Sequence, residues 1–219
     1  MTSPAQRVVD TPQTLAEWVD VRLRSAILTG ELAAGEKLRS EHLAAEWGVS
    51  PTPVREAFQR LAGEGMIVIE AQRGARVAEI DAAEAADFYE LRLMLDPRAL
   101  RSSMAAADDS FRRDVNDAHR ALVSTRRGAP EQLAAHRAFH LALLSRCSNR
   151  HLLRMCAQLH DHTQRYQVTG AGAHRGRGAA GEHLALRDAV LADDVKEATA
   201  VLSAHLRATL AAVHASLTS

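Results

Sequence analysis

The sequence is poor in aromatic residues and cysteine, has no net charge, and lacks a long apolar run. Aromatic side chains make up only 4% of its 219 residues, a composition that favours helices. Because no apolar run approaches the length of a membrane span, no membrane segment is expected. The first residues lack a basic start followed by an apolar block, so no secretion signal is expected. The two cysteines, Cys147 and Cys156, make no disulfide framework and predict a cytoplasmic protein.

The charge balance alone does not indicate a nucleic-acid-binding protein. The chain has 27 Lys and Arg against 27 Asp and Glu, and within residues 1–78 we count nine basic and ten acidic side chains. Proteins that bind nucleic acids usually show a basic excess. Any contact with DNA is therefore expected to come from a local patch.

The first third of the chain has the element order of a winged helix-turn-helix. Helical periodicity predicts helices at residues 14–29 and 40–47, and a third from Pro51 to about residue 64. Gly48 ends the second helix, and Ser50 and Pro51 are a strong start for the third, with Ser50 as its cap. Residues 66–70 and 76–78 then predict a β-hairpin.

From Asp81 onward the pattern is helical almost throughout, which predicts an all-α antiparallel bundle. Pro97 predicts a kink or break in the first of these helices, and the glycines of residues 170–181 predict a loop. The predicted helices lie near residues 81–106, 110–127, 130–146, 149–168, 182–192 and 194–215. The predicted domains are residues 1–78 (winged helix-turn-helix, DNA-binding), 79–83 (linker) and 84–219 (all-helical, effector-binding and dimerising).

A DNA-reading surface is predicted at the start of the third helix and on the hairpin. Unpaired N–H groups at a helix start and the Thr52 hydroxyl suit a phosphate oxygen, and Arg55, one turn further on, suits a guanine edge or a phosphate. The alternative is that the arginines are solvated surface groups. The candidate DNA-binding residues are Arg39, Ser50, Thr52, Arg55, Arg60, Arg73 and Arg76.

Four of the eleven histidines form a pattern that indicates a metal site. His136 and His140 are four residues apart and share a helix face, while His183 and His205 lie among apolar residues of two later helices. Converging buried imidazoles need a metal or a hydrogen-bond network, because a buried imidazole without a partner is costly. Coincidental spacing is the alternative. Six other histidines are predicted to be surface or loop residues: His119, His151, His160, His162, His174 and His214.

The histidine pair also has the spacing of a zinc protease, but the catalytic base is absent. That motif, H-E-x-x-H, needs a glutamate after the first histidine, and Arg137 stands there instead. A cation does not accept a proton from water. The sequence therefore predicts that the protein is not an enzyme, and metal-dependent hydrolysis is retained only as an alternative function.

Residues 35–67, GEKLRSEHLAAEWGVSPTPVREAFQRLAGEGMI, resemble the DNA-binding domain of the GntR family of bacterial transcription regulators. The family pattern is L-A-x-x-x-G-V-S-R-T-P-V-R-E-A-L, and the chain departs from it at Pro51, where the family usually has a DNA-contacting arginine. Glu41 and His42 also stand where many members carry a basic residue. These departures are expected to weaken phosphate contacts and change the operator that is read.

Residues 84–216 resemble the helical effector domain of the FadR-type branch, the FCD domain. Glu90-Leu91-Arg92 matches its E-x-R, His136–His140 matches its D-x-x-F-H, and the later E-H and A-H-L motifs are met at His183 and His205. The resemblance implies a divalent metal on His140, His183 and His205. It also implies a small organic acid whose carboxylate completes the coordination of the metal and pairs with Arg92.

His136 replaces the family's aspartate, which changes the expected metal chemistry. A neutral fourth ligand favours ions that prefer imidazole, so zinc is predicted, with nickel or another transition metal as alternatives. His136 could instead bind the effector by a hydrogen bond, and some relatives have no metal.

The resulting prediction is a ligand-responsive regulator, a repressor, that binds a palindromic double-stranded DNA operator as a homodimer and senses a small carboxylate at a metal-containing pocket. The same regulator with a metal-free pocket for another effector is the alternative.

Overall fold

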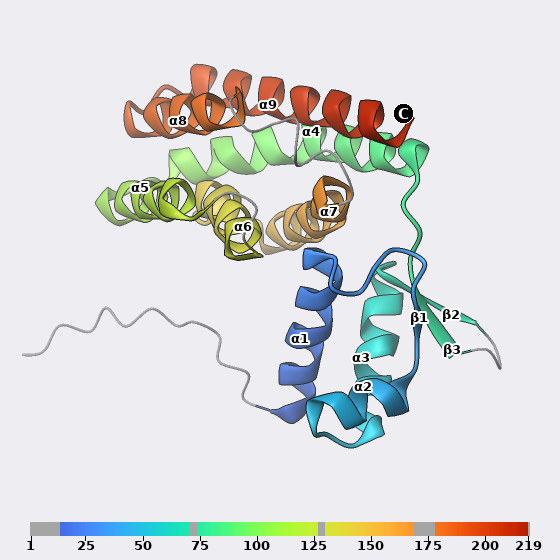
Figure 1. The fold of residues 1–219 in the computed structure, drawn as a ribbon. Coiled ribbons are helices and arrows are strands. Elements are labelled where there is room, and N and C mark those ends of the chain that lie inside the picture. Colours follow the sequence, from blue (N-terminus) through green and yellow to red (C-terminus); the bar gives the residue numbers. More distant parts are fainter. Residues whose placement is uncertain (1–13, 71–73, 127–129, 169–177, 219) are drawn as a thin grey trace, which may run out of the picture. The chain divides into compact units, whose positions relative to one another are not determined.

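The computed structural model describes residues 14–70, 74–126, 130–168 and 178–218. The chain divides into two compact units, residues 1–79 and 80–219, and each is considered by itself (Figure 1). Most of the described chain is helical and the strands form one small sheet, so the predicted fold class is confirmed. No helix among the described residues is long and apolar enough to span a membrane.

The first unit is a winged helix-turn-helix. Its helices α1 and α2 both pack against α3, and strand β2 follows α3 and packs on it (Figure 1). The elements are α1 (Leu15–Thr29), β1 (Lys37–Leu38), α2 (Ser40–Trp47), α3 (Pro51–Gly63), β2 (Ile67–Glu70) and β3 (Gly74–Val77). The sheet has the antiparallel order β1-β3-β2. Strand β1 was not predicted, because two residues are too short to show an alternating pattern.

Local signals in the sequence account for the helix ends of the first unit. Thr14 and Glu17 form a capping box at the start of α1. Gly48 ends α2 in the left-handed region, with φ 68°. Ser50 occupies the N-cap position of α3, as predicted, but its side chain makes no capping hydrogen bond. Ser50 is exposed there instead.

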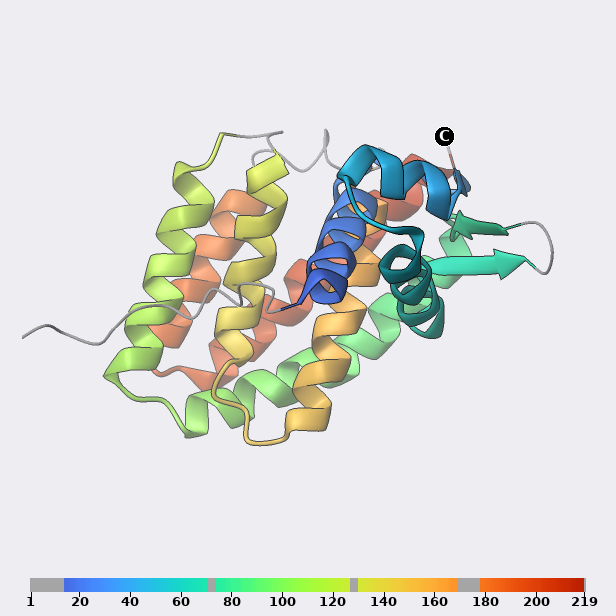
Figure 2. The same ribbon diagram turned by 90° about the horizontal axis from the view of Figure 1, so that it is seen from below.

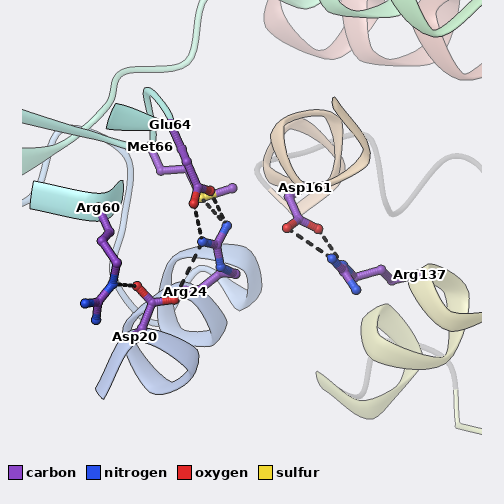
Figure 3. A network of polar contacts seen from close by, with 7 residues as sticks. All are labelled: Asp20, Arg24, Arg60, Glu64, Met66, Arg137 and Asp161. Atoms are coloured by element: carbon purple, nitrogen blue, oxygen red, sulfur yellow. Dashed lines mark hydrogen bonds and ion pairs between the residues drawn. The ribbon is translucent and has the colours of Figure 1, made fainter. Parts of the chain in front are cut away.

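A network of ion pairs ties α1 to the end of α3 (Figure 3). The Arg24 guanidinium donates to both carboxylate oxygens of Glu64, at 2.6 and 2.8 Å, and lies 3.7 Å from Asp20. Asp20 in turn accepts from Arg60 at 2.9 Å. Alongside this network the apolar residues of the three helices form the core of the unit, in which Leu23 and Leu61 are fully buried.

The described residues of the second unit form a bundle of six helices. They are α4 (Ala82–Ala105), α5 (Asp109–Ser124), α6 (Pro130–Leu144), α7 (Arg150–Val168), α8 (Gly178–Leu191) and α9 (Val195–Leu217). Helix α4 packs against α9, α7 and α6, while α8 packs between α9 and α5 (Figure 2). The core contains Tyr89, Phe111, Phe139 and Leu143, all fully buried.

Two sequence predictions for the second unit are corrected. Pro97 lies inside α4, which runs unbroken from Ala82 to Ala105; the proline removes one backbone hydrogen bond, and packing of the helix against its neighbours compensates. The last four residues of the predicted loop at 170–181 are helical instead, because α8 begins at Gly178. Its first turn includes Ala179 and Ala180, which are strong helix formers. Residues 170–177 lie outside the described part of the chain, and the predicted linker, residues 79–83, includes the first two residues of α4.

Replacement of Leu61 by alanine should destabilise the first unit by about 2–5 kcal/mol, because the side chain is fully buried and leaves a cavity. The two tryptophans of the chain, Trp18 and Trp47, both lie in this unit. Urea unfolding followed by tryptophan fluorescence therefore measures it separately from the helical bundle. Val68→Ala is the matched control, because Val68 is 49% exposed, and it should change the stability by less than about 0.5 kcal/mol. Equal effects of the two replacements would contradict the assigned core.

Candidate DNA-binding surface and metal site

A groove in the first unit runs between the start of α2, helix α3 and the sheet. Its lining includes Lys37, Arg39 and Arg55, together with Gly74 of β3. Ser50 is exposed and Thr52 is exposed at the start of α3, where the free N–H groups of a helix terminus favour an anion. Basic side chains and hydroxyls therefore gather at one end of α3, although the unit as a whole is not basic.

Arg55 is held in place by the start of α2. Its Nη2 donates to Glu41 at 2.5 Å and its Nε donates to the Ser40 hydroxyl at 3.3 Å. The hydrogen bond from Arg55 lowers the pKa of the Glu41 carboxyl, which is therefore ionised at neutral pH. Both side chains are exposed to solvent. An acceptor that approaches Arg55 would therefore either displace Glu41 or use the N–H groups of Arg55 that remain.

The other candidate arginines are not equivalent. Arg76 of β3 donates to Glu70 at 3.1 Å and to the Gly35 carbonyl at 2.8 Å, within the wing. Arg60 is not brought together with the groove residues: it faces α1, where it binds Asp20 and the Ala16 carbonyl at 3.0 Å. Its position on α3 is about one turn and a half past Arg55, which turns it toward α1. Arg73 lies outside the described residues.

In the second unit the four histidines singled out in the sequence converge. His136 and His140 come from α6, His183 from α8 and His205 from α9. One nitrogen of each lies within 4.8 Å of the corresponding nitrogens of the other three. His140, His183 and His205 are buried, and His136 is partly buried. Residues from three helices that are far apart in the sequence thus form one site.

The donor atoms of this cluster fit a tetrahedral metal ion. The Nε2 atom of His140 lies 3.1 Å from Nε2 of His136 and 3.3 Å from Nε2 of His183. Neighbouring ligand nitrogens of a tetrahedral zinc ion are about 3.3 Å apart, given zinc–nitrogen bonds of about 2.0–2.1 Å. In a neutral imidazole Nε2 carries either one proton or one lone pair, so without a cation His140 shares that single proton or lone pair between two contacts. A cation at the centre would accept a lone pair from each ring.

A carboxylate outside the cluster orients one of the imidazoles. Glu182 lies 2.7 Å from Nδ1 of His205, which leaves Nε2 of His205 to point its lone pair into the cluster. Such carboxylate–histidine contacts commonly fix the orientation of metal-binding histidines. The two residues of the E-H motif therefore have different roles. His183 belongs to the cluster, and Glu182 contacts His205 from outside it. Sequence reasoning identified the motif but gave no role to Glu182.

Three histidines predicted to be on the surface are buried instead. They are His119, His160 and His162. His160 lies beside the cluster, with its ring centroid 5.3 Å from that of His140, and neither of its ring nitrogens has a hydrogen-bond partner. His162 stacks on Phe88 at 4.4 Å. His119 continues the buried stripe of Phe111, Val115 and Leu122 on α5, so the apolar period could have indicated its burial. His160 and His162 lie in a stretch of α7, residues 159–166, that is buried on all sides, which no single apolar face predicts. His151 and His214 are exposed, as predicted, and His174 lies outside the described residues.

Burial keeps two imidazoles of the cluster neutral. It is the largest cause that holds the pKa of His136 and of His140 well below the usual histidine range, and the neighbouring histidines lower both further. Burial, followed by the positive charge of Arg92, lowers the pKa of His160 in the same way. A neutral imidazole offers the lone pair that a metal ion requires.

Arg92 of α4 is buried next to the cluster. It donates to Asp96 at 2.9 Å and to the Thr163 hydroxyl of α7 at 2.8 Å. Arg92, Asp96, His140 and His160 line one small cavity of about 10 Å³, which is room for about one water molecule. The second oxygen of Asp96 is buried without a hydrogen-bond partner. The other residues that line the cavity are four leucines and Cys156, so a few polar side chains meet in a small and mainly apolar space.

Arg137, which stands where a zinc protease needs its base, instead joins two helices. Its guanidinium donates to both oxygens of Asp161 on α7 (Figure 3). The ion pair holds α6 and α7 together next to His136 and His160. The residue therefore has a place in the packing of the bundle and offers no proton acceptor.

Comparison with known proteins identifies both units. Residues 15–77 match the gntR family of bacterial regulatory proteins, and residues 87–208 match the FCD domain. The chain belongs to the GntR family. Its second unit is an FCD domain, as the resemblance of residues 84–216 predicted. Both domains, and the relatives that follow, are those of transcriptional regulators and not of enzymes.

The GntR relatives match along most of their length. The chain is 33% identical over 210 residues to the uncharacterized HTH-type transcriptional regulator BphR of Paraburkholderia xenovorans, which covers 92% of this chain and 86% of BphR. It is 28% identical over 195 residues to the HTH-type transcriptional repressor GlaR of Escherichia coli, with 84% and 89% covered. The solved structure of E. coli McbR/YncC superposes with a TM-score of 0.82 over 92% of this chain and 98% of that one, at 21% identity, and so supports the fold alone.

Removal of the buried His119 should change the pH dependence of stability. Burial, followed by the positive charge of Arg187, lowers the pKa of His119 in the folded protein, whereas the unfolded chain titrates near the ordinary value of about 6.5. Below a pH of about 6.5 His119 binds a proton in the unfolded chain but not in the folded protein. Protonation therefore favours the unfolded chain, and the wild type loses stability as the pH falls. His119→Leu should therefore gain stability relative to the wild type as the pH falls from about 7.5 to about 5.5.

The measurement is urea unfolding followed by helical circular dichroism. His151→Leu is the control, since His151 is exposed at the start of α7, and its difference from the wild type should stay constant over the same pH range. A constant difference for His119→Leu as well would show that His119 titrates normally in the folded bundle.

Proposed function

We propose that the chain is a ligand-responsive repressor that binds a palindromic operator as a homodimer and senses a small organic acid at a metal ion in its FCD domain. The observation that carries this proposal is the convergence of four imidazole nitrogens within 4.8 Å, beside a buried arginine, in a chain whose other domain is a GntR helix-turn-helix. Relatives that are named repressors support the direction of regulation.

His136, His140, His183 and His205 would hold the metal. Four neutral nitrogen donors favour zinc, with nickel or another transition metal as the alternatives, over magnesium or manganese, which prefer oxygen donors. When bound, the metal would supply a positive charge and would coordinate an oxygen of the effector. Glu182 supports this assignment because it holds His205 with one nitrogen directed into the cluster. The placement of His136 as a ligand, and not as a hydrogen-bond partner of the effector, is supported by the 3.1 Å contact between its Nε2 and that of His140.

The effector would be a small carboxylate that contacts Arg92. Because the Arg92 guanidinium already pairs with Asp96 and Thr163, the acid has to share or replace these contacts. The cavity of about 10 Å³ is too small for an organic acid, so entry requires that α4 and α7 separate. Asp96 and His160 both have buried atoms without partners, and these would accept or donate hydrogen bonds to further polar groups of the acid.

Movement of α4 would transmit the signal. The helix begins at Ala82, immediately after the first unit ends at residue 79. A ligand that changes the contacts of Arg92 therefore acts on the element next to the DNA-reading unit. An effector that binds more tightly when α4 and α7 are separated shifts the population toward that state.

Operator contacts are proposed for the residues at the groove of the first unit. Arg55 would read a base edge or a phosphate. The other proposed contacts are Arg39, Ser50 and Thr52, with Arg76 on the wing and with Arg73, which lies outside the described residues. Arg60 is left out, because α1 already holds its guanidinium through Asp20 and the Ala16 carbonyl.

Metal analysis tests the sensing site. Protein purified without chelators should carry about one zinc or nickel ion per chain, as expected for one four-ligand site. His140→Ala should lose most of it, because His140 is the imidazole that contacts two others. The exposed His151→Ala is the control and should keep the full content. Sub-stoichiometric metal that is unaffected by His140→Ala would favour a metal-free pocket.

A gel-shift assay tests the DNA-reading surface. On a duplex that the wild-type protein selects from a random-sequence pool, Arg55→Ala should weaken binding by about tenfold to a hundredfold per reading head, the effect of one good base or phosphate contact. Arg60→Ala removes the same charge from the same helix but from the side that faces α1. It should leave binding within about threefold of the wild type. Equal losses from both variants would mean that α3 presents another face to DNA.

A further inference from the structure

Helix α4 has an exposed stripe that continues for most of its length. The residues at spacings of three and four along it are Glu84, Asp87, Leu91, Met94, Arg98 and Arg101, and all six are exposed. This is the a/d spacing of a helix that pairs with another helix. From its first to its last residue the stripe extends over about 26 Å of helix. The opposite face of α4 is buried against the bundle and carries Arg92.

The middle of the stripe is apolar. Leu91 is 43% exposed and Met94 is 58% exposed, although both have large apolar side chains that are normally buried when a partner is available. The two ends of the stripe carry opposite charges, with Glu84 and Asp87 before the apolar pair and Arg98 and Arg101 after it. Glu84 accepts a hydrogen bond from Tyr166 within the unit, so its carboxylate is already directed by α7.

This order of charges is self-complementary. We propose that a second copy of this chain docks on the stripe, α4 against α4 in antiparallel orientation, about a two-fold axis that passes between residues 92 and 93. In this register the acidic end of each stripe faces the basic end of the other. Asp87 faces Arg98 of the other copy, Glu84 faces Arg101, and Leu91 faces Met94.

The antiparallel orientation follows from the same pattern. Each contact occurs twice, as a two-fold interface requires. A parallel arrangement would place like charges together at both ends of the stripe, and it would also set the two helix dipoles side by side in the same direction, which is unfavourable.

The pairing deepens the homodimer of the proposed function and rests on it. The two-fold axis passes next to Arg92, so the proposed effector-binding arginines of the two copies lie on the buried faces of the paired helices, close to the axis. A change in the contacts of Arg92 therefore acts on the helix that joins the two copies. In the sequence the same helix follows each DNA-reading unit directly, so a change in the pairing would act on the segment to which that unit is attached.

Charge reversal tests the register. The association of the full chain is measured by sedimentation equilibrium, without DNA or effector and after treatment with chelator. The wild type should form dimers. Asp87→Arg puts two arginines opposite each other in both facing pairs, and Arg98→Asp puts two aspartates there. Each variant should raise the dimer dissociation constant by about tenfold or more. An equimolar mixture of the two variants should form a heterodimer with a higher affinity than either variant has for itself. In one facing pair the introduced arginine at position 87 meets the introduced aspartate at position 98. In the other pair the native Arg98 meets the native Asp87.

Asp117→Arg and Arg120→Asp are the matched controls, since both residues are exposed on α5 and away from the stripe. They should dimerise like the wild type, and circular dichroism should show unchanged helix content for all four variants. The proposal is overturned if the wild type is monomeric, if either α4 variant dimerises like the wild type, or if the mixture associates no better than its components. Because the assay involves no metal, effector or operator, these outcomes are independent of the sensing and DNA-binding proposals.

Discussion

The packing of the second unit depends on how one imidazole nitrogen is satisfied. Nε2 of His140 lies 3.1 Å from one histidine nitrogen and 3.3 Å from another, in a buried environment that keeps the rings neutral. Without a cation this nitrogen shares one proton or one lone pair between the two contacts. A metal ion would accept a lone pair from each of the converging rings, and its position would link α6, α8 and α9. The ion pair of Arg137 with Asp161 and the contact of Glu182 with His205 hold α6 to α7 and α8 to α9 around that point.

Helix α4 has three different features, each on a different part of its surface. One face presents Arg92 to the closed pocket, where Asp96 and Thr163 hold it. Another presents the exposed stripe that includes Leu91 and Met94. Its first turn follows the DNA-reading unit directly. In the proposed function, these three features would let one helix link the effector site, the second copy and the DNA-reading unit. The cavity of about 10 Å³ indicates that binding of an acid must be accompanied by movement.

Much of the fold could be predicted because it depends on local chemistry. Gly48, Ser50 and Pro51 specify the turn and the start of α3 whatever surrounds them, and the period of apolar residues marks the long helices. Most of the errors come from tertiary packing. Strand β1 exists only because its two residues pair with β3. His160 lies in a stretch of α7, residues 159–166, that is buried on all sides, which no single apolar face predicts. His119 is different, because it shares a buried face of α5 with Phe111, Val115 and Leu122, and that period was present in the sequence.

The candidate sites could be predicted only in part, for the same reason. The spacing of His136 and His140, and the resemblance to a known domain, pointed to four histidines that the structure brings together. The partners of the candidate residues left no signal in the sequence. Nothing in the order of residues indicates that Glu182 orients an imidazole, that Glu41 holds the reading arginine, or that Asp20 turns another arginine away from the groove. These contacts follow from the angles at which the helices pack.

The most direct test of the central claim is an anomalous difference map, measured at the zinc absorption edge from crystals of the protein grown with zinc. A metal bound by the cluster predicts one strong peak about 2.0–2.1 Å from a nitrogen of each of His136, His140, His183 and His205. A map without a peak among these nitrogens, with the rings joined by hydrogen bonds or water instead, would contradict it.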